Sequence, residues 1–111
     1  MSTTITSDQL NHYPVLLDKI ISKVPPLNGG TLIDCTFGHG GYTEEFLKNP
    51  KIEMIGIDRD PDAEFFSKRI KEKFKKRFSF FNLRFSEIDK INLTNKEIVG
   101  FLFDLGFSFS Q

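Results

Sequence analysis

Three closely spaced glycines, Gly38, Gly40 and Gly41, follow a short apolar segment, Thr31–Cys35. Glycine lacks a Cβ, so its backbone adopts positive φ and lets a ligand approach closely. The pattern predicts a buried strand, a glycine turn and a helix that begins near position 42 or 43. Because the first amides of a helix carry partial positive charge, an anionic group is favoured there. This layout is typical of a nucleotide-type cofactor site, and an ordinary glycine turn is the alternative.

Two carboxylates accompany the glycine turn and separate the cofactor candidates. Asp34 lies at the end of the first predicted strand, and Asp58 follows the second, 20 residues after Gly38. A carboxylate at the position of Asp58 can accept hydrogen bonds from both ribose hydroxyls. The dinucleotide fingerprint requires a glycine at position 43, where this chain has Thr43. With Asp34 near the mouth of the site and Asp58 across from it, we expect a ligand with ammonium and sulfonium groups, S-adenosylmethionine, rather than a pyrophosphate such as NAD.

The elements that position these residues alternate along the chain. Helices are predicted over about 14–24, 43–48 and 61–76, with a short helical turn over 85–91. Strands are predicted over Thr31–Cys35, Ile52–Ile57, Phe78–Leu83 and Val99–Phe103. Strands that alternate with helices form a parallel sheet with right-handed crossovers. The fold class is therefore α/β and Rossmann-like, and residues 1–11 are expected to be a flexible N-terminal arm.

Composition excludes several classes of protein. The chain has 111 residues, of which 39% are hydrophobic and 27% charged, as in a small globular domain. A formal net charge of +0 argues against a wholly basic nucleic-acid-binding module. Cys35 is the single cysteine, which excludes an internal disulfide and a cysteine-rich metal site, and we expect a packed thiol there. No apolar run reaches the ~18 residues of a membrane span, so the cytoplasm or an organelle matrix is expected.

Basic residues gather at the end of the helix predicted over 61–76. They are Lys68, Arg69, Lys71, Lys73, Lys75, Lys76 and Arg77. Positive charge at a helix C-terminus is stabilising by itself, so a solvated helix end is favoured over an RNA-binding patch.

Four ordered motifs carry a resemblance to a known family. They are His12-Tyr-Pro-Val-Leu-Leu-Asp18, Asp34-Cys-Thr-Phe-Gly-His-Gly-Gly-Tyr-Thr43, Ile57-Asp-Arg-Asp-Pro61 and Asp104-Leu-Gly-Phe-Ser-Phe-Ser-Gln111. In this order and spacing they resemble the bacterial and organellar ribosomal RNA small-subunit methyltransferase H family, formerly called MraW. The resemblance implies a class I methyltransferase fold, S-adenosylmethionine as cofactor, and methylation of the N4 amine of one cytidine in small-subunit rRNA.

The resemblance also assigns roles to residues. It gives cofactor contacts to Gly40, Gly41, Tyr42, Asp58, Phe85, Asp104 and Gln111. The first three would line the methionine end, Asp58 would hold the ribose and Phe85 would pack near the adenine. Asp104 and Gln111 would close the site. The family commonly has Gly-Gly-His-Ser at positions 40–43 and Ser-Ser-x-Gln at the closing motif, so this chain departs from it at both places.

Asp104 is the candidate catalytic residue, at the end of the fourth predicted strand. The exocyclic amine of cytosine is a poor nucleophile, and a carboxylate that accepts its N–H would raise the electron density on nitrogen. The alternative is that Asp104 only orients the cofactor or caps the following turn. The base would have to leave any stack to reach the site.

The resembling family continues beyond this motif with a helical insertion and further strands. We therefore expect residues 12–111 to be the N-terminal half of an S-adenosylmethionine-binding domain, truncated and inactive alone. The fourth strand would then be an exposed edge through which chains self-associate. Small-subunit rRNA or the ribosomal subunit is the expected substrate. The alternatives are a non-catalytic, regulatory partner of a fuller methyltransferase chain and a piece of an NAD-dependent oxidoreductase.

Overall fold

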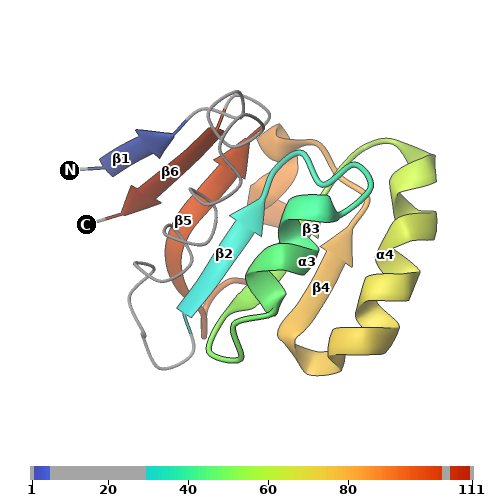
Figure 1. Cartoon of the computed structure of the whole chain (residues 1–111). Coiled ribbons are helices and arrows are strands. Elements are labelled where there is room, and N and C mark those ends of the chain that lie inside the picture. Colours follow the sequence, from blue (N-terminus) through green and yellow to red (C-terminus); the bar gives the residue numbers. More distant parts are fainter. Residues whose placement is uncertain (1, 6–29, 104–105, 111) are drawn as a thin grey trace.

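One mixed sheet of six strands organises the described part of the molecule (Figure 1). The computed structural model describes residues 2–5, 30–103 and 106–110, with side chains described for 30–103. The strands are β1 Ser2–Ile5, β2 Gly30–Asp34, β3 Glu53–Ile57, β4 Phe78–Phe81, β5 Glu97–Phe103 and β6 Gly106–Ser110. They lie side by side in the order β1-β6-β5-β2-β3-β4.

The four central and right-hand strands β5, β2, β3 and β4 are mutually parallel. If these four strands are numbered 1 to 4 along the chain and read across the sheet from β4 to β5, their order is 3-2-1-4. This is the first half of the doubly wound arrangement. The predicted Rossmann-like α/β fold is therefore confirmed. Because the chain reverses its direction of growth between β2 and β5, ligands are expected at the carboxyl ends of these strands.

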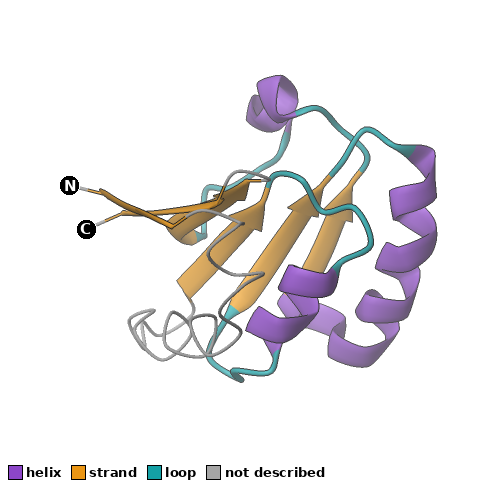
Figure 2. Ribbon diagram, turned by 45° about the horizontal axis from the view of Figure 1, so that its top comes forward, coloured by secondary structure: helices purple, strands orange, loops and turns teal. Residues whose placement is uncertain are grey.

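Two helices cover one face of the sheet, and a short 3₁₀ helix lies at the other (Figure 2). The helices are α3 Gly41–Leu47 and α4 Pro61–Phe74, and the 3₁₀ segments are η1 Lys75–Arg77 and η2 Phe85–Lys90. Asp60 caps α4 by accepting a hydrogen bond from the Asp62 amide at 2.9 Å, and Pro61 begins the helix, as expected. No helix among the described residues is long and apolar enough to cross a membrane.

The strands present alternate side chains to two hydrophobic clusters. Leu32, Met54 and Phe78 face the helices and pack with buried side chains of α3 and α4. Ile33 and Ile55 point to the opposite face, toward η2 and the segment that follows it. Both faces of the parallel strands are thus buried, as a doubly wound sheet requires.

The fourth parallel strand is not an open edge. β5 pairs with β6 in antiparallel register, with Leu102 opposite Phe107, and β6 pairs in turn with β1. The expectation of an unpaired edge on this strand is therefore wrong, and with it the reason given for self-association. Four residues of the expected arm, Ser2–Ile5, form β1. The predicted helix over 14–24 lies outside the described residues.

Arg77 in η1 connects its own segment to the end of α3 and to the turn before β3, at the amino-terminal edge of the sheet. Its guanidinium donates to the carbonyl of Leu47 at 2.8 Å and to the carbonyls of Asn49 and Ile52 at 3.0 Å each. These carbonyls belong to the end of α3 and the turn that leads into β3. Arginine suits this position because its planar fork carries five N–H donors, so one side chain can serve several acceptors.

Three of the other six basic residues of this stretch also contact the protein itself. Lys71 donates to the carbonyls of Lys75 at 2.9 Å and Phe78 at 2.7 Å. Arg69 and Lys73 approach Glu44 at 3.4 and 3.6 Å. These contacts favour the structural interpretation of the basic helix end over an RNA-binding patch.

Replacing Arg77 with alanine is expected to lower the free energy of unfolding by about 2 kcal/mol, because three carbonyls lose their charged donor. The matched control is Lys76→Ala, whose exposed side chain has no hydrogen bond to the residues that the structure describes and should change stability by less than about 0.5 kcal/mol. Urea denaturation measures both. Equal losses of unfolding free energy in the two variants would contradict this role of Arg77.

Candidate functional site

A hollow of about 490 Å³ opens at the carboxyl ends of the parallel strands. Three loops line it: the glycine turn after β2, the loop after β3, and the segment that joins β4 to η2. The lining residues are Cys35, Thr36, Gly38, Asp58, Arg59, Leu83, Arg84 and Phe85. Its place near the reversal of strand order and its volume are those of a small-molecule site.

Phe37 fixes the shape of the glycine turn from below. Its ring is 3% exposed and stacks on Phe78 with centroids 5.6 Å apart. A Cβ on Gly40 would lie 2.8 Å from this ring, and one on Gly56 in β3 would lie 2.6 Å from it. Gly40 also has a φ of 82°, which favours glycine. Gly40 is therefore required by the packing around Phe37.

Gly38 and Asp58 meet across the floor of the hollow. The Gly38 amide donates to Asp58 Oδ2 at 2.8 Å, and the Asp60 amide donates to Asp58 Oδ1 at 2.9 Å. The position of Gly38 is open, with only the Thr36 carbonyl within 4 Å of an added Cβ. An ionised carboxylate has about four acceptor positions, so Asp58 keeps capacity for a ligand while two amides hold it in place.

Asp34 is turned into the protein and does not line the hollow. Its side chain is 1% exposed, and Oδ2 accepts a hydrogen bond from the Thr43 hydroxyl at 2.6 Å. Oδ1 accepts from the Thr36 amide at 3.2 Å. The expectation that Asp34 stands near the mouth of the site is therefore wrong. Thr43, which departs from the dinucleotide fingerprint, supplies the hydroxyl that satisfies this buried carboxylate.

Two arginines contribute positive charge to the hollow. Arg59 and Arg84 line the hollow, and Asp58 is the one acidic residue among its lining side chains. The expected pair of carboxylates, Asp34 near the mouth and Asp58 across from it, is therefore only half present, because Asp58 lines the hollow and Asp34 does not. Charge around the hollow does not by itself favour a cationic ligand over one with phosphates.

Phe85 forms an aromatic wall of the hollow. It is 44% exposed, and its ring stands edge-on to Phe103 with centroids 5.5 Å apart and to Phe101 at 6.0 Å. The rings of Phe101 and Phe103 in β5 are thus partly covered. An exposed aromatic face held by two edge contacts is suited to stack against a planar ring.

The structure brings together some of the predicted site residues and not others. Asp58 and Phe85 line the same hollow, while Gly41 is exposed at the start of α3 and Tyr42 packs partly against the core on the helix side. Asp104 and Gln111 lie outside the described residues.

Sequence reasoning missed Leu83 and Arg84 because the third strand was predicted to continue to Leu83. β4 ends at Phe81, where the Leu83 amide bonds back to the Phe81 carbonyl at 2.9 Å. Asn82 ties the turn to the neighbouring loop by donating to the Asp58 carbonyl at 2.9 Å. Asn82, a residue common in turns, was the available signal.

Cys35 contributes a thiol that is 7% exposed, consistent with the expected packed residue. Burial, and secondarily the charge of Asp34, raises the pKa of the Cys35 thiol to about 12. Because the thiolate is the reactive form, this thiol is inert at neutral pH. Among the described residues, no group of three or more His, Cys, Asp or Glu side chains is arranged to hold a metal ion.

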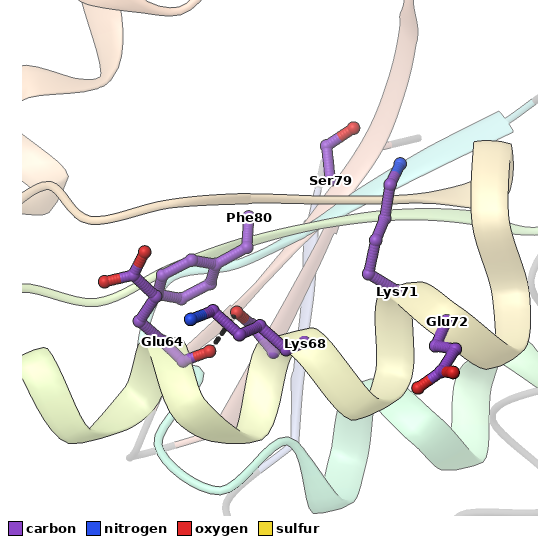
Figure 3. A pocket seen from close by; sticks show the side chains of 7 residues that line it. Glu64, Lys68, Lys71, Glu72, Ser79 and Phe80 are labelled. Carbon is purple, nitrogen blue, oxygen red and sulfur yellow. Dashed lines mark hydrogen bonds between the residues drawn. The ribbon is translucent and has the colours of Figure 1, made fainter.

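A second hollow, of about 570 Å³, lies between α4 and β4 (Figure 3). Figure 3 shows Lys71 reaching from the helix toward the strand, where it donates to the Phe78 carbonyl. The Ser67 hydroxyl donates to the Glu64 carbonyl at 2.7 Å. Because these polar groups serve the protein itself, the hollow at the loop edge is the better candidate site.

The sheet order, the glycine turn and the helices that follow the strands define an α/β domain with a Rossmann-like fold. The chain belongs to the MraW methylase family, whose model matches residues 9–111. Three similar proteins are each named ribosomal RNA small subunit methyltransferase H. They come from Wolinella succinogenes, at 45% identity over 90% of this chain, Zymomonas mobilis, at 40% over 96%, and Neorickettsia sennetsu, at 38% over 96%. The chain spans about a third of the length of the curated relatives it matches, 33% to 36% for these three.

Replacing Thr43 with valine is expected to destabilise the fold by about 1–3 kcal/mol, because the buried Asp34 carboxylate loses its hydroxyl donor. Thr43→Ser keeps that hydroxyl and is the matched control, with a smaller loss. The free energy of unfolding in urea distinguishes them. If valine is tolerated as well as serine, the bond from Thr43 does not hold the turn.

Proposed function

We propose that this chain carries the donor-binding part of an S-adenosylmethionine-dependent methyltransferase. The proposed reaction is methylation of the N4 amine of a cytidine in small-subunit rRNA, within the cytoplasm or an organelle matrix. Family membership and the names of the relatives support the methyltransferase class and rRNA as the substrate. The donor and the N4 atom are proposed from the motifs of the sequence.

The observation that carries the proposal is the pairing of Gly38 and Asp58 on the floor of the loop-edge hollow. The carboxylate is oriented by two amides before any ligand arrives, which lowers the entropic cost of binding. Its remaining acceptor positions suit the two ribose hydroxyls of an adenosyl group. Phe85 lines the same hollow and would pack against the adenine ring.

The remaining proposed contacts belong to neighbouring segments. Gly40, Gly41 and Tyr42 would lie toward the methionine end of the donor, and Gln111 would close the site. Gly40 also has the packing role described above, so a substitution there would perturb the turn before it perturbed a ligand.

The chemistry requires little from side chains beyond alignment. The donor supplies a methyl group on a sulfonium, and methyl transfer to nitrogen is a direct displacement. The protein must hold the amine in line with the methyl carbon and exclude water. Asp104 is proposed to accept an N–H of the amine and steady the positive charge that develops on nitrogen. Orientation of the donor is its alternative role.

Asp58→Asn should raise the Kd for S-adenosylhomocysteine by about 10- to 100-fold, because the ribose loses a charged acceptor. Isothermal titration calorimetry on the 111-residue chain measures this. Asp60→Asn is the matched control, since asparagine is also a good N-cap and Asp60 does not line the hollow; its Kd should stay within about twofold.

Two results would contradict the proposal. One is equal Kd values for the Asp58 and Asp60 variants. The other is tighter binding of NADH than of S-adenosylhomocysteine to the unmodified chain, which would favour a dinucleotide site.

A further inference from the structure

We propose that Arg59 and Arg84 bind phosphates of a single-stranded RNA segment at the rim of the loop-edge hollow. This inference rests on the proposed function, because it names residues that hold the substrate of the same site. It assigns a role to two side chains that are not among the proposed donor contacts: Arg59 lies within one of the four motifs without an assigned role, and Arg84 lies outside them.

The two arginines lie on neighbouring loops at one edge of the sheet. Arg59 follows β3 and Arg84 follows β4, and both line the same hollow. Both side chains are exposed. Within residues 30–103, neither guanidinium makes a hydrogen bond or an ion pair shown by the structure, unlike Arg69 and Arg77, which bind Glu44 and backbone carbonyls.

The acidic groups around them are already bound. Asp58 accepts from two amides, and Asp60 accepts from the Asp62 amide. Glu87, which follows Arg84 in η2, accepts from the Arg84 amide at 3.1 Å and from Lys90 at 2.7 Å. These hydrogen bonds fix the carboxylates without removing their charge, and the charges of Arg84 and Glu87 interact. Neither guanidinium forms an ion pair within residues 30–103, so both forks remain available.

A free guanidinium fork is complementary to a phosphate. Arginine presents parallel N–H donors that match two phosphate oxygens, which gives both attraction and geometric selectivity. S-adenosylmethionine has no phosphate, and its single anionic group, the methionine carboxylate, could occupy at most one of the two forks. Its methionine end is proposed to lie toward Gly40, Gly41 and Tyr42, so the donor does not account for both arginines. The whole chain has a formal net charge of +0, so attraction to RNA must come from a local pair such as this one. RNA backbone entering beside the hollow would place a base near the donor.

The chain offers a matched pair of control cations at the opposite edge of the sheet. Lys51 precedes β3 and Lys76 precedes β4, and both are exposed. The double variants Arg59→Gln/Arg84→Gln and Lys51→Gln/Lys76→Gln therefore remove the same charge from the two ends of the same strands.

The experiment measures binding of a short fluorescein-labelled single-stranded RNA to the 111-residue chain by fluorescence anisotropy over a series of salt concentrations. The arginine double variant should bind RNA about 10-fold more weakly, and the slope of log K against log salt should fall in magnitude by about 1.4, or about 0.7 for each lost phosphate contact. The lysine double variant should change RNA affinity by less than about twofold. The Kd for S-adenosylhomocysteine, measured in parallel, should stay within about twofold in both.

The parallel measurements separate failure of this inference from failure of the proposed function. Equal RNA affinity in the two double variants, or no RNA binding by the unmodified chain, overturns the inference while intact binding of S-adenosylhomocysteine leaves the proposed function standing. Loss of affinity for S-adenosylhomocysteine in the arginine double variant, with RNA affinity retained, also overturns it. Absence of S-adenosylhomocysteine binding, with arginine-dependent RNA binding retained, overturns the proposed function and supports the phosphate contact.

Discussion

Phe37 and the two glycines that surround it set the geometry of the loop edge. The ring fills the space between the glycine turn and the sheet, and side chains at Gly40 or Gly56 would enter that space. With the ring in place, the Phe37 amide bonds to the Ile57 carbonyl at 3.2 Å, which ties the turn to the end of β3. The open face of Gly38 is then presented to Asp58. Packing below the turn therefore determines which backbone atoms face the hollow above it.

The aspartates at the ends of the adjacent parallel strands β2 and β3 have different roles because they differ in burial and in their hydrogen-bond donors. Asp34 is 1% exposed and receives the Thr43 hydroxyl, so it stabilises the turn from inside. Asp58 receives backbone amides and stays partly exposed, so it can still bind a ligand. A buried carboxylate needs a full set of donors, and a ligand-binding one needs acceptor capacity left over.

Much of the fold followed from hydrophobic periodicity and turn residues, because four strands separated by helices leave few arrangements of a parallel sheet. Strand β6 was missed although Gly106–Ser110 alternates aromatic and small polar residues, since the segment was interpreted as a motif. At the site, Asp58 was predicted from its spacing after the glycine turn, and Phe85 from the family resemblance. The burial of Asp34 and the presence of Arg84 depend on tertiary contacts and on where β4 ends, which local pattern does not determine.

The most direct test is a titration of the isotopically labelled chain with S-adenosylhomocysteine, followed through its amide ¹H–¹⁵N NMR spectrum. We predict that the largest shifts fall on the amides of Gly38, Asp58 and Phe85, which come from the three loops that line one hollow. Amides of Ser67 and Ser79, at the hollow between α4 and β4, should not move. Shifts concentrated at Ser67 and Ser79, or no shifts at saturating ligand, would contradict the account.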